Sequence, residues 1–270
     1  MQFFRLLWRA VAVWFSREAD IHAAALAYFV PFALTPLFLL SITIVGMLIG
    51  GNEVGMLLLS WGNAIDPDLT GLLDSSVRNF DTLTTAYVVP IMAVLFFSTM
   101  IIVSLNSVST ALQKIWGIET YSFHNLVVRT VRSFLFVILL QAYLVWIILL
   151  NRTATFVADV PLVSMLNQVY PLVIFFSTVL LITFGYGLLP TKAPRFKARL
   201  YGALVASVLF FFTRELVALH TAASPIPDVF GAAGIIILLL VWIYVSASIV
   251  LYGAAFAGVY EEHRLKKITR

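Results

Sequence analysis

Two adjacent charged residues, Arg214 and Glu215, interrupt the apolar stretch LFFFTRELVALH at 209–220. If this stretch crosses a membrane, both are functional candidates, because an ionisable side chain is costly at depth unless it is paired or hydrated. Neighbouring helical residues are about 100° apart around the helix axis, so these two side chains are poorly placed to pair with each other. Two interpretations of Arg214 stay open. It binds an anionic group in an internal cavity, or it extends toward the outer headgroups while Glu215 bonds a neighbouring helix.

Two polar residues in other apolar stretches, Gln141 and Asn106, are further candidates for a substrate path. Such residues either line a polar passage or form hydrogen bonds between helices, and the second role is the more common one in membranes. Pro31 and Pro36 remove backbone donors and should kink the helix that carries them, and Gly231 precedes the last apolar stretch. We consider these three residues as candidates for a structural or gating role.

No constellation typical of a catalytic or metal site is found. Cysteine is absent, which excludes thiol nucleophiles and cysteine-ligated metals. The four histidines show no ligand spacing, and there is neither a phosphate-binding glycine–lysine loop nor a GxSxG elbow. The outer acids are spread over one loop rather than clustered, as two-metal hydrolysis would require. We therefore expect no enzyme, no cofactor and no metal, and we regard ribonuclease activity and nucleic-acid binding as disfavoured.

The composition predicts a membrane protein. Of 270 residues, 61% are hydrophobic and 11% are charged, whereas a soluble domain carries about 25% charged residues. A spanning helix needs about 20 mostly apolar residues, and the long continuous runs exclude a β-barrel. We predict an all-α integral membrane protein, a bundle of six transmembrane helices in one membrane domain, 1–270. The predicted spans are approximately 23–49, 86–108, 133–150, 170–189, 200–222 and 234–259.

The distribution of the 17 Lys and Arg residues predicts the orientation. Only Arg78 and Arg152 fall in the second set of alternate loops, and Arg214 lies within a span. All the other basic residues flank the spans on one side. Because basic loops stay in the cytoplasm, both termini are predicted to be cytoplasmic, in the inner (plasma) membrane of a bacterium.

The segments outside the spans have predicted roles as well. Residues 1–22 should form a cytoplasmic interfacial amphipathic helix, since aromatic residues alternate with Arg5, Arg9 and Arg17 over the first 18 positions. The outer loop 50–85 should contain short helices, and 260–270 is a basic cytoplasmic tail. The basic side is expected to contact membrane lipids, especially anionic headgroups, with each Lys or Arg gaining about 1 kcal/mol there.

Several stretches together resemble the YihY/BrkB family of bacterial inner-membrane proteins, formerly labelled ribonuclease BN. They are AAALAYFVPFALTPLFLLSI at 23–42, ALQKIWGIE at 111–119, YGLLPTKAPRFKARLYGALVASVLFF at 186–211 and FGAAGIIILLLVWIYVSASIVLYGAAFAGVY at 230–260. The resemblance implies six helices and a transport-like role. The family often has glutamates near the positions of Phe211 and Ala255, which are absent here, and a basic residue where Arg214 stands.

These observations lead to two functional hypotheses. The first is a permease or exporter, for an anionic or lipid-linked envelope component, in which Arg214 contacts the anion. The alternative is a non-transporting membrane scaffold that supports envelope assembly. A polar cavity open to one side would favour the first, and a solid bundle with an exposed apolar groove the second. The substrate, a small or lipid-like molecule, the energy source and a homo-oligomeric state are left open by the sequence.

Overall fold

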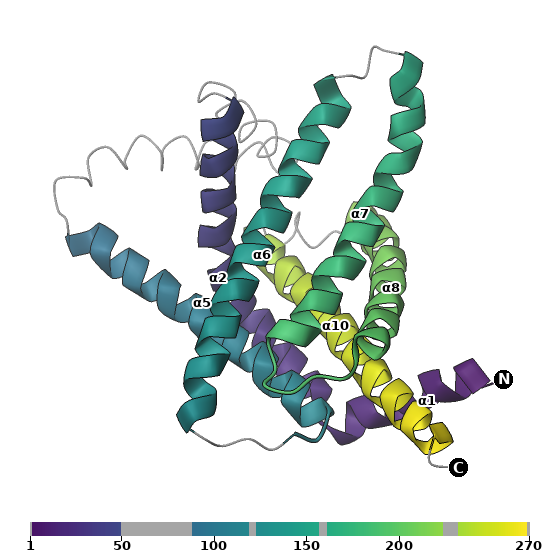
Figure 1. The fold of residues 1–270 in the computed structure, drawn as a ribbon. Helices are drawn as coiled ribbons and strands as arrows, with labels where there is room; N and C mark the ends of the chain where they lie inside the picture. The colour runs from purple at the N-terminus through teal and green to yellow at the C-terminus, as the bar shows by residue number, and fades with distance from the viewer. Residues whose placement is uncertain (1, 50–87, 119–122, 157–160, 224–231, 269–270) are drawn as a thin grey trace.

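The protein is all-α throughout the part that the structure, a computed structural model, describes: residues 2–49, 88–118, 123–156, 161–223 and 232–268. Figure 1 shows long helices that cross one another in a splayed bundle. In this part the helices are α1 (Gln2–Ser16), α2 (Ala19–Ile49), α5 (Val88–Ile115), α6 (Phe123–Phe156), α7 (Pro161–Leu188), α8 (Phe196–Ala223) and α10 (Ala232–Ile268). The predicted outer helices of 50–85, and Gly231, lie outside the described residues.

Four helical segments of the described chain are long and apolar enough to cross a membrane: Thr130–Leu150, Tyr170–Leu188, Phe196–Thr213 and Ile236–Lys267. They overlap the last four predicted spans. The first two predicted spans fall in α2, of 31 residues, and α5, of 28 residues, of which only part of the side chains are described. The coarse prediction of a helical membrane protein therefore agrees with the structure.

The helices are longer than the predicted spans. Helix α6 begins at Phe123, ten residues before the predicted 133, and α10 continues to Ile268 beyond the predicted 259. Hydropathy marks where the apolar run ends, whereas the helix continues while its backbone hydrogen bonds remain favourable in the interface. The extra turns carry many of the basic and acidic residues described below.

Helix α1 has one buried and one exposed face. Leu6 and Ala10 are buried, whereas Phe4 is 78% and Trp8 is 76% exposed. The buried face packs mainly on α10, and Tyr252 of α10 donates a hydrogen bond of 3.1 Å to the carbonyl of Leu7. An exposed aromatic face beside arginines is typical of a helix that lies in a membrane interface. The predicted helix at the N-terminus is therefore present, although it ends at Ser16.

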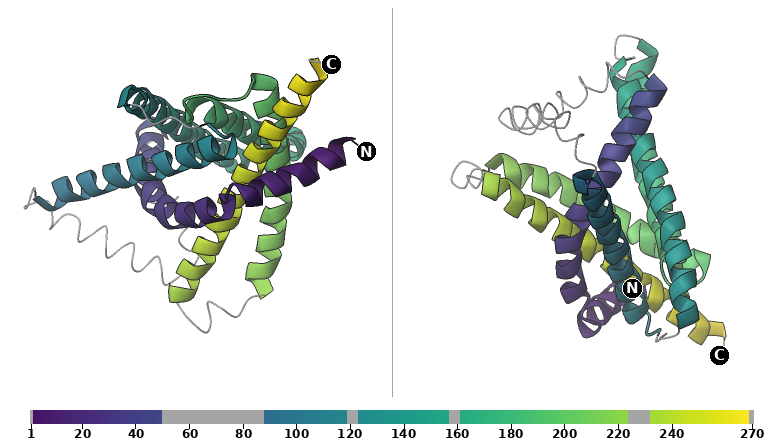
Figure 2. Two further views of the ribbon diagram at one scale, coloured as in Figure 1. Left: turned by 90° about the horizontal axis from the view of Figure 1, so that it is seen from below. Right: turned by 90° about the vertical axis from the view of Figure 1, so that its left-hand side faces the viewer.

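Helix α2 contains both Pro31 and Pro36 and continues through them. In Figure 1 and the right view of Figure 2, its two halves run in different directions. A proline has no amide hydrogen to donate and its ring displaces the preceding turn, so a bend is expected there. The gating role of the two prolines remains a prediction.

Helix α10 lies at the centre of the fold, where it packs against α8, α2, α1 and α5. Its closest neighbour is α8, because both helices present small residues to each other. A Cβ atom at Gly202 would lie 2.4 Å from the carbonyl oxygen of Gly253, and one at Gly253 would lie 2.6 Å from that of Gly202. Ala203, Ala206 and Ala254 beside them are fully buried. Such close backbone approach is how helices gain van der Waals contact in lipid.

The contact of α8 with α10 makes Gly253 intolerant of any side chain. We expect Gly253→Leu to cost about 1–3 kcal/mol or more, because the new atoms would overlap the Gly202 carbonyl and Ala206. The thermal midpoint of the purified protein, measured in one detergent, should fall. Val208→Leu is the matched control, since Val208 is an exposed residue of α8. Equal midpoints for Gly253→Leu and the wild type would contradict this packing.

Candidate functional site

A pocket of about 510 Å³ lies at the end of the bundle where the basic segments meet. Its walls come from residues 13–17 at the end of α1, 115–118 at the end of α5, 192–194 between α7 and α8, and 255–265 of α10. We call this end, with residues 13–18, 114–118, 189–199 and 255–267, the basic end. Figure 1 shows these segments together on one side of the molecule, with both termini nearby.

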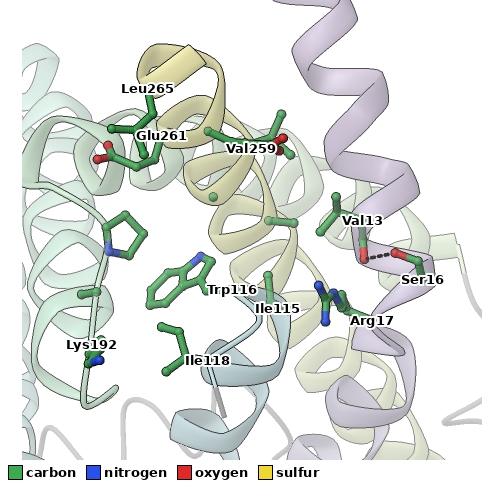
Figure 3. A pocket seen from close by; sticks show the side chains of 15 residues that line it. Val13, Ser16, Arg17, Ile115, Trp116, Ile118, Lys192, Val259, Glu261 and Leu265 are labelled. Atoms are coloured by element: carbon green, nitrogen blue, oxygen red, sulfur yellow. Dashed lines mark hydrogen bonds between the residues drawn. The ribbon is translucent and has the colours of Figure 1, made fainter. Parts of the chain in front are cut away.

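Trp116 stands in the middle of this pocket (Figure 3). Its indole nitrogen donates a hydrogen bond of 2.8 Å to the carbonyl of Ala254, and a Cβ at Gly258 would lie 2.9 Å from its ring. The ring also meets Tyr186 edge to face at 6.2 Å between centroids. Trp116 is thus held against α10, where glycine and alanine leave room for it.

The turn after α5 explains why Trp116 points into the pocket. Gly117 has a φ of 66°, a left-handed conformation that glycine adopts without the Cβ penalty. The amide of Ile118 bonds to the carbonyl of Gln113 at 2.9 Å, and that of Gly117 to Lys114 at 3.1 Å. This pair of bonds is the Schellman motif, which ends a helix and satisfies its last carbonyls.

The acids of the pocket are each paired with a cation outside its wall. Oε1 of Glu261 faces Arg195 at 3.5 Å, while its buried Oε2 has no hydrogen-bond partner among the described residues. Glu262 faces Arg9 at 3.2 Å and Lys266 at 2.6 Å. The two cations that line the pocket, Arg17 and Lys192, differ from these acids in their pairing. Within the described residues, neither the Arg17 guanidinium nor the Lys192 ammonium has a side-chain hydrogen bond or an ion pair. The unpaired charges of the wall are therefore positive.

A further ion pair connects the junction between α1 and α2 to α5. Glu18 has a φ of 55° and bonds to the Lys114 ammonium of α5. This hydrogen bond, and the charge of Lys114, hold the pKa of the Glu18 carboxyl below its usual range. A left-handed conformation costs a non-glycine residue about 1–2 kcal/mol, so tertiary contacts must maintain it.

The segment between α7 and α8 is held by two neighbouring helices. Arg132 of α6 donates hydrogen bonds from Nη1 to the carbonyls of Pro190 at 3.1 Å and Thr191 at 3.0 Å. Ser109 of α5 donates to the carbonyl of Leu189 at 2.8 Å. Lys192 follows directly, so its backbone is held at the pocket rim while its side chain is exposed.

Among the predicted site residues that the structure describes, Gln141, Asn106, Pro31 and Pro36 do not line this pocket. Arg214 and Glu215 lie in α8, and their side chains are outside the described part. The side-chain amide of Gln141 in α6 forms a hydrogen bond of 2.7 Å with the hydroxyl of Ser41 in α2. When the amide is turned so that its oxygen accepts from Ser41, its nitrogen donates to the main-chain carbonyl of Leu37 at 3.1 Å. The main-chain carbonyl of Asn106 accepts a hydrogen bond of 2.8 Å from the Thr110 hydroxyl. Gln141 thus links α6 to α2.

Arg17, Trp116 and Lys192 are not among the site residues that the sequence predicts. One signal was available, because Gly117 directly after an apolar helical run predicts a helix end, with Trp116 as its last residue. Nothing local indicates that the end of α1 and residues 192–194 meet this turn. Among the described residues, no group of three or more His, Cys, Asp or Glu side chains could hold a metal ion.

Comparisons with known proteins identify the family. The family described as Virulence factor BrkB matches residues 13–270. A UPF0761 membrane protein of Coxiella burnetii (strain Dugway 5J108-111) is 27% identical over 253 residues, which cover 88% of this chain and 86% of that protein. One from Psychromonas ingrahamii is 40% identical over 78 residues, 28% of this chain and 27% of that protein. One from Chlorobium luteolum is 27% identical over 187 residues, 66% and 42% of the two chains.

No solved structure matches the chain. The names of these relatives state a membrane protein and no activity. Because the family match covers nearly all of the chain, and the apolar helices agree with a membrane location, the protein belongs to the BrkB family of membrane proteins.

Proposed function

We propose that this protein is a permease or exporter of the bacterial inner membrane, which moves an anionic or lipid-linked envelope component. The observation that carries the proposal is the pocket at the basic end, with Arg17 and Lys192 unpaired among the described residues. Transporters expose their binding site to one side at a time, and a cavity open at one end of the bundle suits one such state. A scaffold has no need of unpaired cations in a cavity.

The proposed topology has six spans with both termini in the cytoplasm. It is supported by the gathering of Lys and Arg at the basic end and by the two termini on that side of the molecule (Figures 1 and 2). Helices α2 and α5 would supply the first two spans. The proposed protein has no catalytic activity of its own, and its inner face contacts anionic lipid headgroups.

Cysteine labelling tests this topology, since the chain has no cysteine of its own. A cysteine introduced at Asn63 should react with an impermeant reagent added outside the inner membrane, because residues 50–85 are predicted to be external. A cysteine at Lys197 should react only after the membrane is opened, because the basic end faces the cytoplasm. The reverse pattern would show that the orientation is wrong.

Arg214 provides a test of transport. A central arginine costs about 2.5–3.5 kcal/mol even on lenient insertion scales, so a hydrated anion site would explain its presence. We expect cells with Arg214→Gln to resemble a deletion strain, with the same untransported lipid or metabolite accumulating, while Arg214→Lys retains part of the activity because it keeps the charge. Mass spectrometry of metabolites and lipids from deletion and complemented cells measures this.

Glu215→Gln is the control, and it should be milder if Glu215 only bonds between helices. All variants must be compared at equal membrane levels, so that a folding defect is not mistaken for lost transport. Full activity of Arg214→Gln would refute an anion site at Arg214. An identical metabolite and lipid profile in deletion and complemented cells would refute transport altogether.

The purified protein should not hydrolyse RNA. No metal-ligand cluster lies among the described residues, and the sequence contains no motif for phosphodiester hydrolysis. The measurement is cleavage of a labelled RNA by protein freed of contaminating nucleases. Cleavage that disappears when a single acidic residue is changed would contradict this expectation.

A further inference from the structure

The charge balance of the pocket at the basic end decides which ligand it suits. Its acids, Glu261 and Glu262, form ion pairs with Arg195, Arg9 and Lys266, none of which lines the pocket. Arg17 and Lys192, which do line it, have no such partner in the described part of the chain. A ligand that enters the pocket therefore meets two uncompensated positive charges, which favours an anion.

Arg17 is suited to hold the anion. Its guanidinium lies over the turn after α5, where a Cβ at Gly117 would be 3.2 Å from Nη2. The last carbonyls of α5 give this region a partial negative charge, which stabilises the guanidinium in place. Several of its five donors remain for a ligand, and their fork geometry matches the oxygens of a phosphate or carboxylate.

The rest of the wall is apolar. Trp116 separates Arg17 from Lys192 in Figure 3, and Val13, Pro194 and Leu265 add further apolar surface. A ligand that reaches from one cation toward the other must cover the indole ring. The volume of about 510 Å³ lies within the range of small-molecule pockets, about 300–1,000 Å³, and is larger than an inorganic anion needs.

We propose that this pocket binds an amphiphilic organic anion, whose charged group contacts Arg17 and whose apolar part covers Trp116. Lys192 adds a second positive charge at the opposite rim. The inference rests on the proposed transport function, because it names the class of substrate that the site at the basic end would accept. A membrane lipid with an anionic headgroup and a soluble amphiphile share this chemistry.

Native mass spectrometry of the full-length protein in detergent tests the proposal. The probes are dihexanoyl phosphatidylglycerol, dihexanoyl phosphatidylcholine with the same chains and no net charge, hexyl phosphate, and glycerol 3-phosphate without an apolar part. We expect one bound phosphatidylglycerol with an affinity at least tenfold above those of phosphatidylcholine and glycerol 3-phosphate. Tighter binding of phosphatidylglycerol than of hexyl phosphate indicates a lipid ligand, and the opposite order indicates a soluble one.

Three variants locate the binding. Arg17→Gln and Lys192→Gln should each reduce the preference for phosphatidylglycerol over phosphatidylcholine about tenfold, since each removes one charge from the wall. Lys197→Gln, an exposed basic residue at the same end that does not line the pocket, should keep the preference. Lys192 lies outside the helices, so its variant tests the charge even if Arg17→Gln disturbs the turn after α5.

Three results would overturn the proposal. They are equal binding of phosphatidylcholine, equal binding of glycerol 3-phosphate, and a loss for Lys197→Gln as large as that for Arg17→Gln. The last would show general attraction to a basic surface. Binding is measured at equilibrium and does not require transport. A protein that binds the lipid but gives no change in the deletion strain would refute transport alone, and a protein that transports without binding the lipid would refute this inference alone.

Discussion

The contact between the backbones of α8 and α10 constrains the positions of the other helices. Gly202 and Gly253 lie against each other's carbonyl oxygens, with alanines around them, so the two helices have no room to slide past each other. Apolar side chains gain little from leaving lipid for another apolar surface, and close packing with hydrogen bonds must supply the association energy instead. Gly253 also leaves room for Tyr186 of α7, and Gly258 for Trp116 of α5, to reach the main chain of α10. Both rings donate hydrogen bonds to its carbonyls, at Ala254 and Val250.

The charged contacts at the basic end follow from this arrangement. Three ion pairs there join segments that are far apart in the chain, namely Arg9 with Glu262, Lys114 with Glu18, and Arg195 with Glu261, and a fourth joins Lys266 to Glu262 within α10. Most of these side chains are substantially exposed, so each pair contributes little, about 0–1 kcal/mol, to stability. Their effect on the pocket is electrostatic. Because the acids are already in ion pairs, Arg17 and Lys192 determine whether the pocket favours an anionic or a cationic ligand.

The sequence predicted the helical membrane architecture because a long apolar run has few stable forms in lipid, and the helix satisfies its own backbone. It also predicted a helix at the N-terminus from alternating aromatic residues and arginines, but over residues 1–22, whereas α1 ends at Ser16. It did not predict the pocket, because Arg17, Trp116 and Lys192 come from three separate segments. Their proximity depends on tertiary packing, such as the hydrogen bonds from Arg132 and Ser109 to residues 189–191. The role of Arg214 is predicted only from the free-energy cost of placing a charged side chain inside the membrane, since its side chain lies outside the described part.

The central position of α10 has a consequence for biosynthesis, because this helix leaves the ribosome after the other described helices. Proteins are inserted and begin to fold from the N-terminus during translation. Until α10 follows, the indole of Trp116 and the hydroxyl of Tyr186 lack the carbonyls that they bond to in the finished protein. The small-residue face of α8 likewise has no partner. The earlier helices therefore form an open intermediate whose polar groups depend on interfacial water, lipid or an insertase until α10 packs against them.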